Sequence, residues 1–286
     1  MLYETIPLPV PGADGPAQLT AYVPEAFPEL GPDRKRPALI ICPGGGYNHL
    51  SNREGEPVAL RFAGLGYAAF LLHYSLECWP IPQRQLLAAI DYVRINAERY
   101  HVRPDAVVPM GFSAGGHLAA CSGTMWNKPE VYRPLKKKSH AFRPDALVLC
   151  YPVITSGSHA HRESFVNLLG NRYDELLDAV SIEKRVTRKT PPVFLWHTAD
   201  DTTVPVENTL LMDKALESRG VDHEMRVYPH GSHGQSLADR TVFALDSMHR
   251  LSVSCSVWVS HCDAWLQRHF GEAAAPEDGT EPSARP

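Results

Sequence analysis

Short, almost wholly apolar runs alternate along this chain with longer segments in which apolar residues recur every three or four positions. A run without polar positions is typical of a strand buried on both faces, since neighbouring residues point to opposite faces of a sheet. Such strands, with a more mixed one at the end of the series, are predicted at 38–42, 67–73, 106–110, 146–153, 192–196 and 224–228. Two further strands, at 2–7 and 18–24, are predicted as a pair at the sheet edge.

The segment 83–100 has the clearest helical pattern. Its apolar positions follow one another at spacings of four and three, which places them on one side of a helix: Leu86, Ile90, Val93, Ala97 and Tyr100. Further helices are predicted at 207–219, ended by Gly220, and at 257–270. Strands that alternate with helices predict an α/β fold, with a mostly parallel central sheet flanked by helices on both faces.

Three segments interrupt this alternation. The polar and basic segment 127–143 is predicted to be a surface loop. The segment 156–190 lies between two predicted strands and is long for a connection, so we expect a small cap insertion over the functional site. The end, 271–286, is rich in Ala, Pro and Glu without periodicity and is predicted to be a disordered tail. A single domain over 1–270 is expected.

The charge, the apolar runs and the cysteines of the chain limit the partners and the compartment that we expect. The chain has 286 residues with 28 Lys and Arg against 32 Asp and Glu, so its net charge of −4 gives no electrostatic reason to expect nucleic acid or an anionic membrane. The first residues lack the features of a secretory signal, and no apolar run has the length of a membrane span. The six cysteines are scattered without a C-x-x-C pair, which fits a reduced cytoplasm.

The candidate chemistry begins with Gly111-Phe112-Ser113-Ala114-Gly115, a G-x-S-x-G sequence between the predicted strand 106–110 and an apparent helix start. In this context a serine is held on a sharp turn with its hydroxyl exposed. Glycines are needed there because the strand and the helix approach so closely that a side chain would clash. The pattern predicts Ser113 as a nucleophile.

A serine nucleophile needs a histidine base and an orienting carboxylate. Asp200 and Asp201 follow the strand 192–196, and His230 and His233 follow the strand 224–228. Both pairs therefore lie at the carboxyl edge of the sheet, where open parallel sheets build their sites. The chain order Ser, Asp, His is that of a known class of hydrolase, but the residues alone leave each pair open.

Several motifs together carry a resemblance to a known family. They are Cys-Pro-Gly-Gly-Gly-Tyr at 42–47, Glu-Gly-Glu-Pro at 54–57, the serine turn, Cys-Tyr-Pro-Val-Ile-Thr-Ser-Gly at 150–157, the Asp-Asp…Val-Pro loop and His-Gly-Ser-His-Gly at 230–234. Over residues 38–235 the chain resembles the α/β-hydrolase superfamily, and within it bacterial acetyl esterases and acetylxylan-esterase-like proteins. The resemblance implies a serine carboxylesterase that hydrolyses short-chain, chiefly acetyl, esters of sugars or xylo-oligosaccharides through an acyl-Ser113 intermediate.

The resemblance also selects among the candidate site residues. An Asp three residues before the Val of Val-Pro corresponds to Asp201, and the His of G-x-H-G corresponds to His233. Backbone N–H groups of Gly45, Gly46 and Ala114 are expected to form the oxyanion hole. Pro43 stands where related lipases have His, so the bracing of this loop must differ. Asp200 is then expected to be a turn residue that hydrogen-bonds the loop backbone.

The histidines also allow roles other than that of a catalytic base. His230 is expected to line the substrate pocket or to brace its loop. His230 and His233 could also form an H-x-x-H metal pair, with His159 and His161 as further ligands. Serine hydrolysis explains His233 without a metal, and no carboxylate or cysteine has ligand spacing. We therefore predict no metal and no cofactor.

The predicted partner is a small ester, with an acetylated oligosaccharide as the candidate. Tyr47 and Trp79 could stack on a sugar face, although either could equally belong to the core. One rival function is a prolyl-oligopeptidase-type serine peptidase, but this length leaves no room for the large extra domain of that class. A non-catalytic ligand-binding hydrolase fold is the other rival, and it predicts a damaged triad, whereas Ser113, Asp201 and His233 are all present.

Overall fold

A computed structural model of the protein describes residues 1–27, 29, 31, 34–243, 248 and 250–271. Its centre is an eight-stranded sheet with the strand order β1-β2-β4-β3-β5-β6-β7-β8. The strands are β1 (Leu2–Leu8), β2 (Ala17–Val23), β3 (Arg36–Cys42), β4 (Ala68–His73), β5 (Val102–Phe112), β6 (Leu147–Cys150), β7 (Val193–Thr198) and β8 (His223–Tyr228). The pairings β1–β2 and β2–β4 are antiparallel and all others are parallel. The predicted mostly parallel sheet, with a pair of strands at its edge, is confirmed, and the structure shows that this pair is antiparallel.

Consecutive apolar side chains of β3 point to opposite faces of the sheet, and a hydrophobic core lies on each face. Ile40 packs into the hydrophobic cluster on one face of the sheet, while Leu39 and Ile41 pack into the cluster on the other. All three side chains are completely buried. A strand covered on both faces has no polar position, which is why this run reads as continuously apolar in the sequence.

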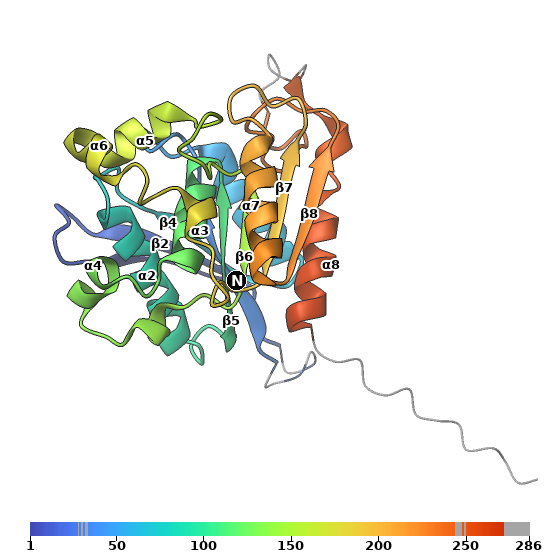
Figure 1. The fold of residues 1–286 in the computed structure, drawn as a ribbon. Helices are drawn as coiled ribbons and strands as arrows, with labels where there is room; N and C mark the ends of the chain where they lie inside the picture. Colours follow the sequence, from blue (N-terminus) through green and yellow to red (C-terminus); the bar gives the residue numbers. More distant parts are fainter. Residues whose placement is uncertain (28, 30, 32–33, 244–247, 249, 272–286) are drawn as a thin grey trace, which may run out of the picture.

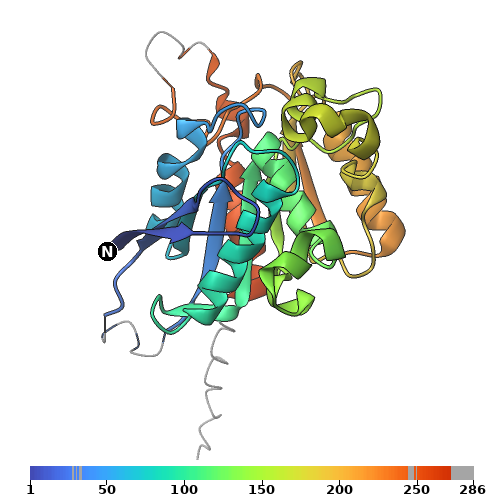
Figure 2. The same cartoon turned by 90° about the vertical axis from the view of Figure 1, so that its left-hand side faces the viewer.

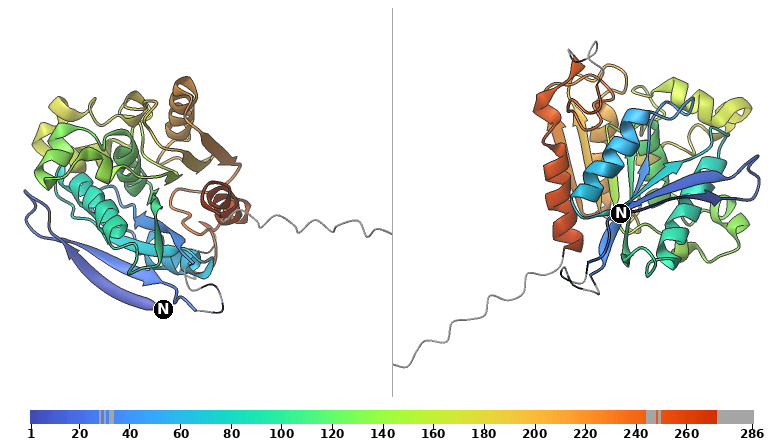
Figure 3. Two further views of the ribbon diagram at one scale, coloured as in Figure 1. Left: turned by 90° about the horizontal axis from the view of Figure 1, so that it is seen from below. Right: turned by 180° about the vertical axis from the view of Figure 1, so that it is seen from behind.

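Helices cover both faces of the sheet. The longer ones are α1 (Glu56–Gly64), α2 (Ile81–Ile95), α3 (Ala114–Thr124), α7 (Glu207–Arg219) and α8 (Trp258–Phe270). Apolar side chains of α2, α3 and α7 belong to one core cluster and those of α1 and α8 to the other. Figure 1 shows α2, α3 and α7 in front of the sheet. The right-hand view of Figure 3, from behind, shows α1 and α8 on the opposite face. This arrangement confirms the predicted layers.

The predicted helix 83–100 is too long at its end. Helix α2 stops at Ile95, and the following residues form turns that lead into β5 at Val102. Ala97 and Tyr100 are still buried on the core side, so they continue the apolar pattern without continuing the helix. The helix predicted at 207–219 has the observed bounds, and Gly220 ends it with φ of +63°.

The segment 127–143 is more ordered than the predicted surface loop. It contains α4 (Pro129–Tyr132) and the 3-10 helices η3 (Arg133–Leu135) and η4 (Ser139–Phe142). Val131 and Phe142 are buried in the core, and these two apolar anchors hold the segment against the helical layer. The loop prediction is corrected accordingly, because basic residues around the anchors masked them in the sequence pattern.

Residues 156–190, predicted as a cap, contain α5 (Arg162–Leu169), η5 (Gly170–Arg172), α6 (Tyr173–Leu176) and η6 (Ile182–Lys184). Figure 1 shows α5 and α6 beyond the carboxyl ends of the parallel strands, and Figure 2 shows the β1–β2 hairpin on the opposite flank of the molecule. The short helices η2 (Asn52–Glu54) and η8 (Val253–Cys255) complete the secondary structure that concerns the site. Residues 272–286 of the predicted tail lie outside the described residues.

None of the helices in the described part of the chain combines the length and the apolar character needed to cross a bilayer.

Candidate active site

Ser113 occupies a sharp turn between β5 and α3. Its backbone has φ of +53° and ψ of −118°, a conformation that costs a non-glycine residue on the order of 1–3 kcal/mol. Hydrogen bonds on both sides hold it there: the Ser113 N–H donates to the Cys150 carbonyl at 3.0 Å, and the Val153 N–H donates to the Ser113 carbonyl at 3.1 Å. The end of β6 therefore fixes the strained turn that presents the hydroxyl.

Glycines make this turn possible. A Cβ atom at Gly111 would lie 2.0 Å from the carbonyl oxygen of Gly115, and one at Gly115 would lie 2.1 Å from the carbonyl oxygen of Cys42. No side chain fits at such distances, so the strand and helix backbones can touch only because these positions carry none. The sequence argument for the G-x-S-x-G turn agrees with this geometry.

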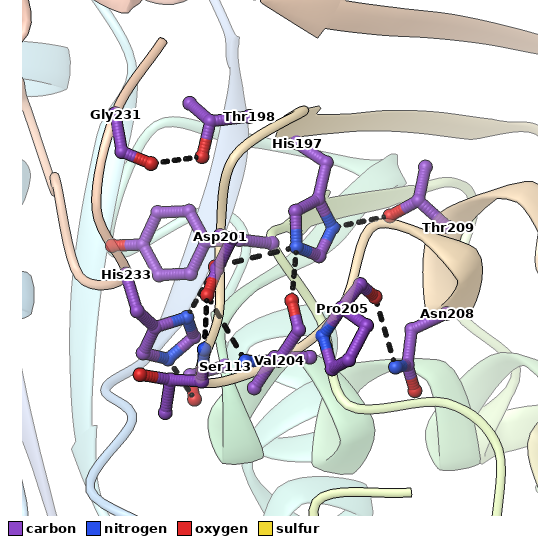
Figure 4. A network of polar contacts seen from close by, with 12 residues as sticks. Ser113, His197, Thr198, Asp201, Val204, Pro205, Asn208, Thr209, Gly231 and His233 are labelled. Carbon is purple, nitrogen blue, oxygen red and sulfur yellow. Dashed lines mark hydrogen bonds and ion pairs between the residues drawn. The ribbon is translucent and has the colours of Figure 1, made fainter. Parts of the chain in front are cut away.

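The structure brings Ser113, His233 and Asp201 together, as Figure 4 shows. The distance from Nε2 of His233 to Oγ of Ser113 is 2.8 Å, and that from Nδ1 of His233 to Oδ2 of Asp201 is 2.6 Å. A carboxylate only accepts hydrogen bonds, so Nδ1 carries the proton and Nε2 is left to accept from the serine hydroxyl. This is the geometry in which histidine can remove the serine proton.

Asp201 is buried, with 5% of its surface exposed, and it is well supplied with donors. Its Oδ1 accepts the backbone N–H groups of Thr203 at 2.9 Å and Val204 at 3.0 Å. Nε2 of His197 lies 3.4 Å from its Oδ2 and 2.8 Å from the Val204 carbonyl. Burial alone raises the pKa of Asp201, but hydrogen bonds from His197 and His233 outweigh it and hold the pKa well below its usual range. The carboxylate is therefore ionised at neutral pH.

Asp200 and His230, the rival acid and base, do not contact Ser113 and instead lie in surface loops. Oδ1 of Asp200 accepts the Gly231 N–H at 2.7 Å, and Nδ1 of His230 lies 3.4 Å from its Oδ2. Asp200 thus hydrogen-bonds loop backbone as predicted, but the backbone is that of the loop at 230–234 and not that of its own turn. His230 is exposed, its carbonyl accepts the Ser254 hydroxyl at 2.9 Å, and it does not line the cavity at Ser113. The His230 carbonyl thus braces its loop, and substrate binding by its side chain stays a prediction.

The glycine loop after β3 offers backbone donors beside Ser113. Gly45 and Gly46 have φ of +119° and +62°, and both line the same cavity of about 290 Å³ as Ser113 and His233. Within the described residues, the N–H groups of Gly45, Gly46 and Ala114 donate to no protein acceptor. Buried or half-buried N–H groups without a partner are what an oxyanion hole requires.

The two aromatic residues considered for sugar stacking belong to the core. Tyr47 is 3% exposed, and its hydroxyl lies 2.8 Å from Nδ1 of the completely buried His117. Trp79 is 9% exposed, and its backbone N–H donates to the carbonyl of Leu168 at 2.8 Å. Both rings belong to the core cluster, which is one of the two alternatives that the sequence left open for them, and the assignment of Tyr47 to substrate binding finds no support in this geometry.

Sequence reasoning missed several residues that shape the site. The ring of Tyr151 meets that of His233 edge to face at 5.1 Å, and the buried Glu54 lines the cavity at Ser113. Both stand in motifs that the sequence analysis quoted, which was the available signal. Cavity residues from outside those motifs, among them Glu163 and Arg250, had none.

The histidines do not gather into a metal site. Both ring nitrogens of His233 are already engaged, and Nδ1 of His161 lies 2.8 Å from the hydroxyl of Ser164. His159 lies 3.9 Å from a carboxylate oxygen of Glu207. In the part of the chain that is described, no group of three or more His, Cys, Asp or Glu side chains is placed to hold a metal ion.

A second cavity, larger at about 770 Å³, lies between the β1–β2 hairpin and α1. It shares Ser51 with the cavity at Ser113 but contains none of Ser113, His233 and Asp201. Size alone therefore does not mark the reactive site here, because the ordered donor–acceptor chain lies in the smaller cavity.

A family model described as BD-FAE matches residues 27–216. The chain belongs to the BD-FAE family. This BD-FAE chain is similar to the crystal structure of an acetyl ester-xyloside bifunctional hydrolase from Caldicellulosiruptor lactoaceticus, with 35% identity and a TM-score of 0.79 over 93% of this chain and 96% of that one. The α/β-hydrolase fold predicted from the sequence is confirmed.

Curated relatives of the BD-FAE chain include endo-1,4-beta-xylanase B from Butyrivibrio fibrisolvens, which is 36% identical over 78% of this chain and 36% of the relative. An acetylxylan esterase from Xylanibacter ruminicola is 31% identical over 77% of this chain and 44% of the relative. The chain thus spans less than half the length of these two relatives. Their likeness supports the predicted resemblance to acetylxylan-esterase-like proteins.

Proposed function

We propose that this protein is a serine carboxylesterase that hydrolyses short-chain, chiefly acetyl, esters through an acyl-Ser113 intermediate. The observation that carries the proposal is the unbroken chain from Ser113 through His233 to Asp201, beside three backbone N–H groups that have no acceptor in the part of the chain that the structure describes. Chance placement of a serine, a histidine and an acid does not produce two hydrogen bonds in series at 2.8 and 2.6 Å.

In the acylation step, Nε2 of His233 accepts the Ser113 proton while Oγ forms a bond to the ester carbonyl carbon. The carbonyl oxygen becomes an oxyanion and accepts hydrogen bonds from the N–H groups of Gly45, Gly46 and Ala114. The tetrahedral species then breaks its bond to the alcohol oxygen, which takes the proton from His233. In deacylation, water takes the place of the serine hydroxyl, and His233 removes its proton in the same way.

Two electrostatic features lower the barrier in this scheme. Asp201 is ionised and buried, so it stabilises the imidazolium that forms when His233 is protonated. Each oxyanion donor is worth about 2.7–4 kcal/mol in related catalytic sites. Glycine suits two of the donor positions because Gly45 and Gly46 have positive φ and leave the backbone open to the substrate.

We infer that the alcohol portion of the substrate is a sugar or a xylo-oligosaccharide. The relatives named acetylxylan esterase and acetyl ester-xyloside hydrolase support this class. A cavity of about 290 Å³ suits a short acyl group better than a long chain. Polar side chains that could hydrogen-bond sugar hydroxyls line it, including Asn48, Ser51 and Thr203.

The test compares wild-type protein with Ser113→Ala on p-nitrophenyl esters of increasing acyl length, acetylated xylo-oligosaccharides and aminoacyl-p-nitroanilides. We expect acetate to be the fastest nitrophenyl ester, acetylated sugars to be hydrolysed, and Ser113→Ala to lose about 10⁴-fold or more of kcat. A fluorophosphonate should label Ser113 alone. Faster anilide than ester cleavage would favour the peptidase, and no labelling of the folded protein would favour the binding module.

A further inference from the structure

One buried acid near the reactive serine has no part in the scheme above. Glu54 is 3% exposed and ends the short helix η2. Its two carboxylate oxygens have different partners: Oε2 accepts the Gly44 N–H at 2.8 Å, and Oε1 accepts the Tyr151 hydroxyl at 2.7 Å. One side chain therefore connects the glycine loop after β3 with the segment after β6.

The contact with Gly44 fixes the start of the loop that carries the oxyanion donors. A Cβ atom at Gly44 would lie 2.7 Å from Oε2 of Glu54 and 2.9 Å from the Cβ of Ser113. Gly44 is thus held between the acid and the serine turn, with no space to shift toward either. The Gly44 N–H donates to Glu54 and is therefore not free to bind a substrate oxygen. The N–H groups of the next two residues, Gly45 and Gly46, which line the cavity, remain as donors.

The contact with Tyr151 reaches the histidine loop. The Tyr151 hydroxyl donates to Glu54 and accepts the Ser236 N–H at 2.9 Å, and Ser236 is on the loop that carries His233. The Tyr151 ring also packs edge to face against the His233 ring. Its backbone, with φ of +37°, is in a region unusual for a bulky residue. Tyr151 therefore links Glu54 to the loop and the ring of His233, the proposed catalytic base.

The charge of Glu54 makes a purely structural role a poor explanation. No Lys, Arg or His among the described residues forms an ion pair with it, and its partners are neutral N–H and O–H groups. A buried carboxylate without a cation is expensive to desolvate, and an apolar side chain would serve packing better.

We propose that Glu54 is a positioning residue for the esterase reaction, holding the oxyanion loop through Gly44 and the catalytic histidine through Tyr151. The inference rests on the proposed function. Glu54 touches neither the reacting atoms nor Ser113 Oγ in this arrangement, so it acts on the rate of the chemical step rather than on substrate binding. Its loss should lower kcat with little change in KM.

Three variants separate the two contacts. Glu54→Gln keeps a carbonyl that can accept the Gly44 N–H, but its NH₂ group cannot accept the Tyr151 hydroxyl proton. Tyr151→Phe removes that hydroxyl and leaves Glu54 with Gly44. Glu54→Ala removes both contacts. The matched control is Glu56→Gln, an exposed acid two positions further on that lies outside the cavity at Ser113.

The measurement is kcat and KM on p-nitrophenyl acetate, expressed per Ser113 that a fluorophosphonate labels at completion, with the melting temperature of each variant. We expect a loss in kcat of about 100-fold for Glu54→Ala, the scale of a misplaced oxyanion donor. Glu54→Gln and Tyr151→Phe should each lose up to about 10-fold, the scale of one hydrogen bond. Adding Tyr151→Phe to Glu54→Ala should cost less than Tyr151→Phe costs in the wild-type protein, because the contact with Glu54 is already lost and only that with the Ser236 N–H remains.

Full kcat per labelled serine in Glu54→Ala and Glu54→Gln would overturn the proposal, whatever happens to their melting temperatures. So would a loss in Glu56→Gln as large as that in Glu54→Gln. If Glu54→Ala does not fold, Glu54→Gln and Tyr151→Phe decide, since both are close in shape to the native side chains. Absence of ester turnover and of labelling in the wild-type protein would instead count against the proposed function itself.

Discussion

Nδ1 of His233 lies 2.6 Å from Oδ2 of Asp201, whereas the adjacent Asp200 turns its carboxylate toward the Gly231 N–H and the exposed His230 ring. Two neighbouring acids thus have opposite surroundings. One is buried and receives hydrogen bonds from two histidines and two backbone amides, and the other supports a surface loop. This difference gives a matched pair of variants for the role of the acid.

Asp201→Asn should lower kcat for p-nitrophenyl acetate by about 10⁴-fold, because an amide cannot hold His233 in the tautomer that accepts the serine proton. Asp200→Asn should retain kcat within about 2-fold, as expected of an exposed side chain away from the chemistry. Steady-state kinetics on the two purified variants checks this. Similar losses in both, or a larger loss in Asp200→Asn, would contradict the assignment of the acid.

Two helical glycines should respond in opposite ways to alanine. A Cβ atom at Gly115 would lie 2.1 Å from the Cys42 carbonyl oxygen, whereas one at Gly64 in α1 would meet nothing within 4 Å. Gly115→Ala should lose about 2 kcal/mol or more of unfolding free energy and most of its activity, because the serine turn must open. Gly64→Ala should gain up to about 1 kcal/mol. Urea unfolding measures both, and a stable, active Gly115→Ala would refute the packing argument.

Local patterns suffice where local physics decides. The apolar runs of the central strands, the glycines of the serine turn and the order of serine, acid and histidine are all short-range signals, and the fold and the meeting of Ser113 with His233 agree with them. The choice between adjacent acids is different, because it depends on which carboxylate faces a loop far along the chain. The residues alone left that choice open, and the resemblance directed it to Asp201.

The sequence did not predict the surroundings of several buried residues, because their burial depends on partners far away along the chain. The sequence leaves Tyr47 open between a sugar-stacking and a core position, and the structure decides for the core because His117, in α3, lies within hydrogen-bond distance of its buried hydroxyl. Glu54 stands among polar residues, yet Tyr151 covers it from another strand end. Tyr100 continues the apolar spacing of α2 although it lies in the turn after the helix, because that turn packs against the same core cluster.

A hydrogen bond joins the predicted cap segment to the glycine loop after β3. Nδ2 of Asn167, in α5, donates to the Gly46 carbonyl at 2.8 Å. Asn167→Ala should lower kcat by up to about 10-fold, the value of one hydrogen bond that orients a donor peptide. The neighbouring Val166, half exposed on the same helix, supplies the control Val166→Ala, expected within about 2-fold of wild type. Kinetics on p-nitrophenyl acetate tests the pair, and equal kcat values would show that α5 does not position the loop.

The buried His117 should make the protein less stable in mild acid. Burial lowers the pKa of His117 to about 4, although a hydrogen bond with the Val180 carbonyl raises it in part, and the ring also contacts Tyr47 and Cys121. The unfolded chain takes up this proton near pH 6.5. Between these values the unfolded state binds more protons, so the unfolding free energy falls as the pH falls from about 6.5 to 4 and this contribution levels off below.

The full contribution of this one group is roughly 3 kcal/mol. Urea unfolding at intervals between pH 7.5 and pH 4.5 should show it in the wild-type protein, and His117→Gln, which cannot titrate, should have a shallower slope by up to about 1.4 kcal/mol per pH unit. All other titrating groups are common to both proteins, so the difference between the two slopes isolates His117. Parallel pH profiles would mean that His117 gains its proton without unfolding, and the buried neutral histidine would then be the wrong description of this part of the core.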